Sequence, residues 1–197
     1  MRPGSRCRLD DHVAVGRPEA VEVIELKDAQ GRPTHFFGLV RPNLQEEWRE
    51  ALSDPEARAL IGRLTGALMQ GQTFDVVGGL ELGAYPIAIA VSDELFRASG
   101  VKLRVFVVRK EPKTHGIKDL IAGNVTPGDR ALIVEDVVTS AGSTLKAIRG
   151  ARTAGLIVER VIALLDREEE HGAANLLATG VQFTPLFKLS DLLVPSR

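Results

Sequence analysis

Cysteine is almost missing from this chain of 197 residues, in which Cys7 is the single example. One thiol cannot form an intrachain disulfide, which excludes the small disulfide-stapled scaffolds and favours a reducing compartment. The sequence also lacks an apolar run near the roughly 20 residues of a membrane-spanning helix, and its N-terminus lacks the apolar core of a signal peptide. We therefore expect a cytoplasmic protein with no membrane partner.

An excess of charge of either sign is missing too. Lysine and arginine total 25 and aspartate and glutamate 26, which gives a formal net charge of -1. This balance creates no general field that attracts nucleic acid or anionic lipid, so a polyanionic ligand must be held by a local cluster of charge. The chain also lacks a P-loop Gly-Lys-Ser/Thr and a dinucleotide-binding G-x-G-x-x-G, which disfavours the common nucleotide folds.

The composition that is present is that of a globular protein, with 44% hydrophobic and 26% charged residues. The length predicts one domain with a small appendage. We place the appendage, an arm and a flap, in residues 1–50, with strands at 21–26 and 34–40. Residues 51–197 then form the core domain.

The core has the pattern of an alternating α/β domain. Short apolar runs without polar alternation predict parallel strands that are buried on both faces. We expect strands at 74–77, 103–108, 131–135 and 158–165, and helices at 54–70, 86–98 and 143–154. This order predicts a doubly wound, mainly parallel sheet, in which ligands bind beyond the carboxyl ends of the strands.

The strongest candidate site follows the strand at 131–135. Glu135 and Asp136 are followed by small residues and the start of a helix, with hydroxyl groups at Thr139, Ser140, Ser143 and Thr144. Such a loop lets successive backbone N–H groups converge on an anion, and the helix N-terminus adds positive potential. Two carboxylates beside a phosphate need another partner, such as a vicinal diol or a Mg²⁺ ion, and a phosphorylated ribose meets both demands. An ordinary capped helix explains Ser143 but not the acidic pair.

A second candidate follows the strand at 103–108, where four potential cations occur within seven residues. They are Arg109, Lys110, Lys113 and His115, in a segment that ends at Gly116. A charge run of this kind is often solvated surface. Its place at the ligand edge of the sheet favours a site for a polyanionic leaving group.

The segment 134–144, Val-Glu-Asp-Val-Val-Thr-Ser-Ala-Gly-Ser-Thr, resembles the motif with which type I phosphoribosyltransferases bind 5-phosphoribosyl 1-pyrophosphate (PRPP). The resemblance implies the fold of that family. It also implies that the acidic pair holds the ribose hydroxyls, that Asp136 is catalytic, and that the loop binds the 5-phosphate. The PRPP-binding residues carried over on this segment are Glu135, Asp136, Val137, Val138, Thr139, Ser140, Ala141, Gly142 and Ser143.

The segment 109–116 is similar to the Arg-Lys-Glu-x-Lys-x-His-Gly signature of orotate phosphoribosyltransferases. The likeness implies transfer of the phosphoribosyl group from PRPP to orotate, with Mg²⁺ carried by PRPP rather than by a protein site. Arg109 and Lys110 would bind pyrophosphate, while Lys113 and His115, on a mobile loop, would be catalytic. It further implies a homodimer in which each loop reaches the partner's active site.

Three weaker segments complete the resemblance. The loop Val77–Ala84 is similar to the pyrophosphate loop of the family, although some members carry lysine where this chain has Leu82. Arg167, after a buried strand, and Thr139 are candidates to contact the base. Phe36 and Phe37 would cover the base, and Lys27 is a further candidate for a substrate contact. Surface charge for Arg167 and a core position for the aromatics are the alternatives.

Two other functions stay open at this point. A phosphoribosyltransferase for a different base would keep the PRPP loop and change the flap, whose 26–37 stretch is one residue longer than the usual pattern. A non-catalytic regulator that senses PRPP would need a nucleic-acid surface, for which only the arginine-bearing arm 1–20 offers material. The complete basic cluster favours catalysis, and we expect no nucleic-acid partner.

Overall fold

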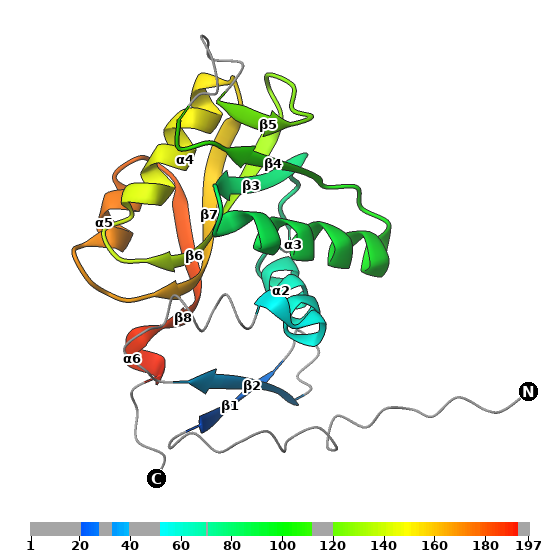
Figure 1. Cartoon of the computed structure of the whole chain (residues 1–197), viewed down its shortest axis with the longest axis vertical. Coiled ribbons are helices and arrows are strands. Elements are labelled where there is room, and N and C mark those ends of the chain that lie inside the picture. Colours follow the sequence, from blue (N-terminus) through cyan, green and yellow to red (C-terminus); the bar gives the residue numbers. More distant parts are fainter. Residues whose placement is uncertain (1–20, 28–32, 40–51, 70, 112–119, 193–197) are drawn as a thin grey trace, which may run out of the picture.

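A six-stranded sheet forms the centre of the molecule. The computed structural model describes residues 21–27, 33–39, 52–69, 71–111 and 120–192. Along the sheet the strand order is β5-β4-β3-β6-β7-β8 (Figure 1). The strands span Val76–Leu80 (β3), Arg104–Val108 (β4), Ile121–Gly123 (β5), Arg130–Val138 (β6), Ile157–Asp166 (β7) and Gln182–Lys188 (β8). Neighbouring strands are parallel except for β5, which runs antiparallel to β4 at one edge.

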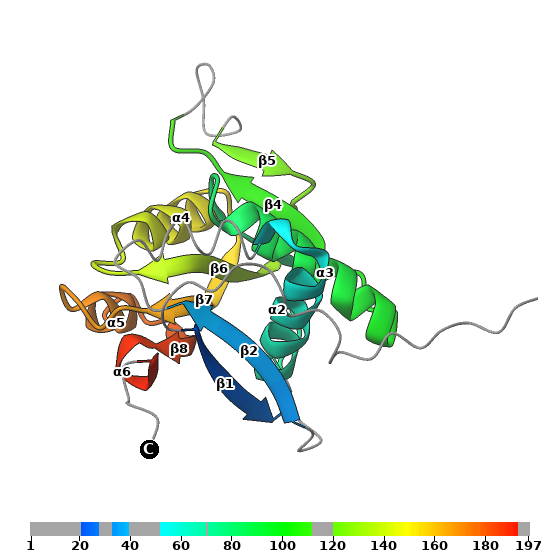
Figure 2. The ribbon, with the colours of Figure 1, turned by 60° about the horizontal axis from the view of Figure 1, so that its bottom comes forward.

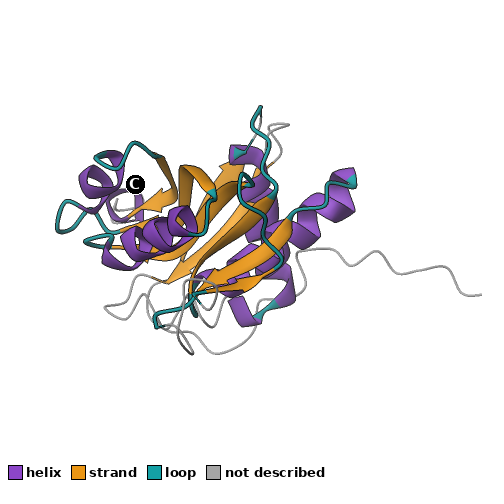
Figure 3. Ribbon diagram, turned by 90° about the horizontal axis from the view of Figure 1, so that it is seen from above, coloured by secondary structure: helices purple, strands orange, loops and turns teal. Residues whose placement is uncertain are grey.

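Helices cover both faces of this sheet (Figure 3). In the part of the chain that the structure describes they are Pro55–Leu68 (α2), Ala84–Ser99 (α3), Gly142–Thr153 (α4), Gly172–Leu177 (α5) and Leu189–Leu192 (α6). The sequence has local reasons for these limits. Asp54 caps α2 by accepting bonds from the backbone N–H groups of Glu56 and Ala57, both at 2.9 Å, and Gly100 ends α3 in the left-handed conformation.

The core consists of two hydrophobic clusters, one on each face of the sheet. Successive residues of a strand point to opposite faces, so Val76 and Ile133 join the cluster that includes α4, while Val77 and Val134 join the cluster that includes α2 and α3. Both faces of the sheet are therefore buried, which explains why the sequences of these strands are continuous apolar runs.

A hairpin makes a second, two-stranded sheet. Val21–Lys27 (β1) pairs antiparallel with Pro33–Leu39 (β2), and Ile24 lies opposite Phe36. Figure 2 shows this hairpin in blue, separate in pairing from the six-stranded sheet. The two strands expected here are present, whereas the arm 1–20 and most of the turn between them lie outside the described residues. The division of the chain near residue 50 stays a prediction.

The predicted α/β fold with a mainly parallel sheet is confirmed, with corrections at the ends of elements. The strand predicted at 131–135 continues to Val138, so Asp136 lies inside β6 rather than after it. The strand predicted at 74–77 begins at Val76 and ends at Leu80, and the helix expected from residue 86 begins at Ala84. The elements β5, α5, β8 and α6 were not predicted.

Candidate functional site

The acidic pair lies near the carboxyl end of β6, and its two side chains leave the strand on opposite faces. Glu135 is 4% exposed, and its Oε2 accepts a hydrogen bond of 3.0 Å from the hydroxyl of Thr144 on α4. Asp136 is half-buried and lies against the start of α3, where a Cβ added to Gly83 would stand 2.8 Å from its Oδ2. The two acids are therefore not equivalent, although the sequence analysis gave them one role.

The pKa of Glu135 is raised from 4.5 to about 8. Burial is the largest cause, and the negative charge and hydrogen bonding of Asp136 also raise it. Hydrogen bonds from Thr144 and Ser143 act in the opposite direction but are outweighed. Desolvation disfavours the charged carboxylate, and a like charge beside it does the same. At neutral pH the free protein therefore carries a neutral Glu135 next to Asp136.

The loop after β6 presents an unbroken row of backbone donors. Within the described residues, the N–H groups of residues 139–144 donate to no protein group. The first bond of α4 is the one from Leu145 N to Ala141 O, at 2.8 Å. Ala141 adopts a left-handed conformation with φ 65°, which turns the chain from the strand into the helix. Successive N–H groups that converge at a helix start form an anion-binding cradle, as the sequence predicts.

Two hydroxyls of this segment differ in their exposure. The Thr144 hydroxyl is one of the candidate phosphate donors of the sequence, but Thr144 is fully buried and its hydroxyl donates to Glu135. Ser143 also hydrogen-bonds to Glu135, but it is exposed at the first turn of α4. The candidate donors from side chains are therefore Thr139, Ser140 and Ser143.

The basic segment begins beside the loop that follows β3. Glu81 joins the two, because its Oε1 accepts a bond of 2.9 Å from the backbone N–H of Lys110, and its own N–H donates to Val108 O at 2.9 Å. Lys110 is exposed. Lys113 and His115, the other two predicted cations, lie outside the described residues.

The glycines of the segment 77–84 serve packing more than the loop. Gly78 and Gly79 lie inside β3, where an added Cβ would stand 2.1 Å from Phe106 O and 2.4 Å from Val134 O respectively. Neither has a positive φ. Leu82, in the loop itself, is 80% exposed, and the peptide bond from Glu81 to Leu82 is cis.

Arg167 directly follows β7 and lies beside residues 139–144, which we call the phosphate loop. Its backbone N–H donates to Val138 O at 2.9 Å, and its guanidinium pairs with Glu169 at 2.8 Å. The Nε atom is buried and has no partner in the described part of the chain. This places Arg167 within the same edge of the sheet as the acidic pair, as predicted.

The predicted base-covering aromatics lie on the hairpin. Phe36 and Phe37 are on β2, and Lys27 is the last residue of β1. The structure describes their backbone only, so their contact with a base stays a prediction.

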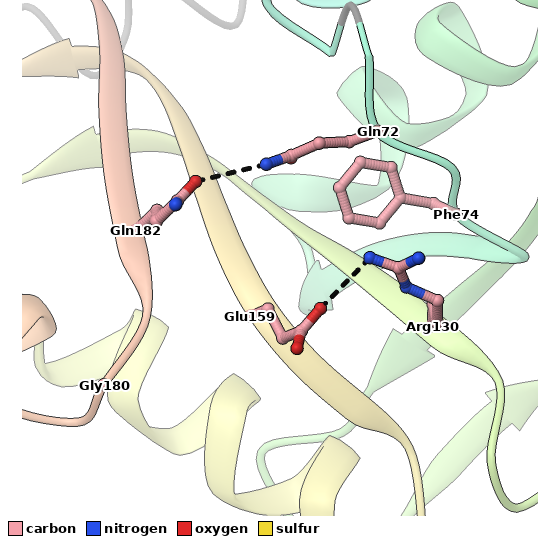
Figure 4. A pocket seen from close by; sticks show the side chains of 6 residues that line it. All are labelled: Gln72, Phe74, Arg130, Glu159, Gly180 and Gln182. Carbon is pink, nitrogen blue, oxygen red and sulfur yellow. Dashed lines mark hydrogen bonds and ion pairs between the residues drawn. The ribbon is translucent and has the colours of Figure 1, made fainter.

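The described residues contain no cluster of three His, Cys, Asp or Glu side chains suited to a metal ion, and none of their helices is long and apolar enough to cross a membrane. A pocket of about 280 Å³ lies at the opposite edge of the sheet, at the amino ends of β6, β7 and β8 (Figure 4). Its polar groups already pair with one another, Gln72 with Gln182 and Arg130 with Glu159, both at 3.2 Å.

Sequence reasoning missed three residues that shape the site. Glu81 connects the two loops described above, and Gly172 and Asn175, at the start of α5, contact the phosphate loop. A glutamate after a glycine-rich strand and an asparagine in a short helix carry no distinctive signal in one sequence. Their partners are far away in the chain, so only the fold reveals them.

The sequence is similar to proteins that are already known. Residues 48–182 match the model of the family described as "Phosphoribosyl transferase domain". The chain is 46% identical over 140 residues to the orotate phosphoribosyltransferase of Aquifex aeolicus, which covers 71% of this chain and 75% of the relative. It is 35% identical over 197 residues to that of Rhodopseudomonas palustris, with 98% of each chain covered.

A solved structure is similar as well. The Mycobacterium tuberculosis orotate phosphoribosyltransferase in complex with PRPP superposes with a TM-score of 0.64 at 36% identity, over 73% of this chain and 80% of that chain. The fold and its phosphate-loop edge thus define a phosphoribosyltransferase. Within that class, the chain belongs to the orotate phosphoribosyltransferase family.

Proposed function

We propose that this protein transfers the 5-phosphoribosyl group of PRPP to orotate, with release of pyrophosphate, to give orotidine 5-phosphate for pyrimidine nucleotide synthesis. The observation that carries the proposal is the row of N–H groups at residues 139–144, which donate to no group in the described part of the chain and follow an acidic pair near the carboxyl end of β6. A phosphate cradle beside carboxylates suits a phosphorylated sugar and little else. The relatives named above support orotate as the acceptor.

In this proposal the two acids divide the work. Asp136, half-buried at the edge of α3, accepts hydrogen bonds from the ribose hydroxyls. Glu135 faces α4, where its bond to Thr144 fixes the first turn of that helix against β6. Residues 137–143 surround the 5-phosphate, whose charge the N-terminus of α4 stabilises.

The departing pyrophosphate needs positive charge on the other side of the ribose. Arg109 and Lys110 follow β4 at the same edge, and Lys113 and His115 continue this basic segment. Mg²⁺ would enter as a complex with PRPP, where it would offset the charge of the leaving group. The bond between the anomeric carbon and the pyrophosphate oxygen breaks ahead of attack by the orotate nitrogen, through an oxocarbenium-like transition state.

The base would lie between the flap and the end of β7. Arg167 is held there by its bond to Val138 O and by Glu169, and Thr139 begins the phosphate loop beside it. Phe36 and Phe37 cover the base in this proposal, so residues 1–50 act as a hood over the PRPP-binding core 51–197. Exclusion of water by such a cover would protect PRPP from hydrolysis.

The assembly and the compartment are also part of the proposal. A homodimer with shared active sites would bring Lys113 and His115 of one chain to the acids of the other. The single Cys7 favours a reducing compartment such as the cytoplasm, and the net charge of -1 favours small molecules as the substrates.

The central test is a comparison of acceptor bases. Purified protein is incubated with PRPP and Mg²⁺ and, in turn, with orotate, uracil, adenine or hypoxanthine, while the absorbance change of each base is followed. We expect conversion of orotate alone. Turnover of another base instead would reassign the acceptor, and PRPP binding without any turnover would favour a regulator.

A second test concerns Asp136. The variant Asp136→Asn is expected to raise the Kd for PRPP at least about tenfold, because a charged acceptor for hydroxyl groups is lost, with little change in stability. The matched control is Asp93→Asn, an exposed aspartate on α3. Calorimetry measures both, and an unchanged PRPP affinity in Asp136→Asn contradicts the role of this acid.

A further inference from the structure

The carbonyl side of the phosphate loop is held by one distant segment, residues 167–175. Val138 O accepts a bond of 2.9 Å from the backbone N–H of Arg167. Thr139 O lies so near Gly172 that an added Cβ would stand 2.1 Å from it. Ser140 O accepts a bond of 3.1 Å from the side-chain amide of Asn175. The three consecutive carbonyls of Val138, Thr139 and Ser140 thus face the turn between β7 and α5.

These contacts of the carbonyl groups also determine where the backbone N–H groups of the phosphate loop point. In a trans peptide the carbonyl of one residue and the N–H of the next point to opposite sides. Of the described peptide bonds, only the one from Glu81 to Leu82 is cis. The N–H groups of Thr139, Ser140 and Ala141 therefore point away from the segment 167–175, and they donate to no described group.

Of these three contacts, only the one from Asn175 is made by a side chain. Its amide also donates to Glu170 O at 3.3 Å, so a single group connects the phosphate loop with the turn that follows Arg167. In that turn Glu168, Glu170 and His171 all have a positive φ, between 49° and 57°. Residues without glycine's freedom hold such angles only where the surroundings fix them, and Asn175 supplies one of the fixing bonds.

We infer that Asn175 is a positioning residue for the 5-phosphate: its amide holds the Ser140 carbonyl so that the Ala141 N–H faces the ligand, and it ties the base side of the site to the phosphate loop. The inference rests on the proposed role of residues 139–143 as the 5-phosphate cradle. Asn175 itself touches no substrate in this arrangement. Its effect is on affinity for ligands that carry the 5-phosphate.

The variants Asn175→Ala and Asn175→Asp remove the amide donor, and the second keeps the size of the side chain. For both we expect the Kd for ribose 5-phosphate and the KM for PRPP to rise about threefold to tenfold, the effect of one or two neutral hydrogen bonds. The Kd for pyrophosphate and kcat at saturating PRPP stay unchanged, and the melting temperature falls by no more than a few degrees, the effect of the same lost hydrogen bonds on stability. Asn124→Ala is the control and leaves all five quantities unchanged. Asn124 is exposed and follows β5, the outermost strand on the side of the sheet opposite β8.

Gly172→Ala adds a stronger perturbation, because its Cβ would displace the Thr139 carbonyl, and we expect a larger loss of ribose 5-phosphate binding than in either Asn175 variant. Calorimetry with ribose 5-phosphate and with pyrophosphate gives the two affinities separately. An equal loss for both ligands, or no loss for either, overturns the inference. The double variant Thr139→Ala/Ser143→Ala distinguishes the reason. If it weakens ribose 5-phosphate while the Asn175 variants do not, only the positioning role fails; if it also has no effect, the cradle itself is misplaced.

Discussion

Replacement of Glu135 by glutamine is expected to stabilise the protein at alkaline pH and to leave its stability unchanged near pH 4.5. Glu135 is 4% exposed, and burial, with the adjacent Asp136, raises its pKa from 4.5 to about 8. Glutamine has nearly the same shape, and its carbonyl oxygen can still accept the 3.0 Å bond from Thr144. The substitution therefore removes the titration without opening a cavity.

The sign follows from proton binding. Between about pH 4.5 and pH 8 the folded chain keeps the proton on Glu135 and the unfolded chain does not, so the free energy of unfolding falls as the pH rises. The stability that the protonated group contributes is fully present below pH 4.5 and is lost as the pH passes through about 8. One such group changes the free energy of unfolding by at most about 1.4 kcal/mol per pH unit, so the total over this range is a few kcal/mol.

Urea unfolding of both proteins at one-unit steps from pH 5 to pH 9 measures the effect. The difference between Glu135→Gln and the parent should grow with pH and level off near pH 9, while groups common to both proteins cancel. Glu159→Gln is the control, because the Glu159 side chain is 62% exposed, and its difference should stay nearly flat. A flat difference for Glu135→Gln, or one that favours the parent at high pH, would refute the reasoning.

Three further predictions concern the proposed mechanism. Lys113→Ala and His115→Ala should each lower kcat by roughly a hundredfold with little change in the Kd of PRPP, since leaving-group charge develops in the transition state; equal losses in both contradict this. Phe36→Ala or Phe37→Ala should raise the KM for orotate alone, whereas a joint loss of stability and PRPP binding would indicate a core position. Co-refolded Lys113→Ala and Asp136→Ala chains should regain about a quarter of parental activity if sites are shared, because about half the dimers are mixed and each has one intact site. Proven chain exchange without recovery rejects sharing.

The sequence predicts the sheet because its central strands are buried on both faces. Continuous apolar runs such as 131–134 have no other explanation in a chain of alternating helices and strands, and the loops that follow parallel strands fall at one edge. That rule predicts the place of the acidic pair, the phosphate loop, the basic segment and Arg167 from the sequence alone. Each of the described members lies at the predicted edge of the sheet.

The edge strands escaped prediction for physical reasons. The strand β8 contains Pro185, which lacks an N–H donor and is tolerated because β8 pairs with β7 on one side only. Its residues are mostly half-buried, so no apolar run marks it. The strand β5 has three residues, too few for a period. Without β8, the short helix α5 that precedes it had no place in the predicted fold.

The different surroundings of Glu135 and Asp136 show how a boundary error becomes a functional one. The strand was expected to end with Glu135, which left Asp136 in the loop after it and gave the two acids one ligand. β6 instead continues to Val138, and the two acids have different neighbours: Glu135 contacts Thr144 on α4, while Asp136 lies against Gly83 at the start of α3. Sequence alone could have extended the strand through Val137 and Val138, which are both buried, but could not have found the separate contacts, because Val134 and Val137, three residues apart, join the same cluster and regular alternation does not hold here.

The phosphate loop shows a limit of a different kind. Its motif specifies small residues and hydroxyls, but a row of N–H groups binds an anion only if the peptides share one orientation, and the motif does not contain the groups that orient them. Those groups are Arg167, Gly172 and Asn175, the last of them 35 residues beyond Ser140. A copy of residues 134–144 in another strand-to-helix turn would have the donors without their alignment. Affinity for the 5-phosphate is therefore a property of two segments together, and variation at residues 167–175 can adjust it while the motif stays unchanged.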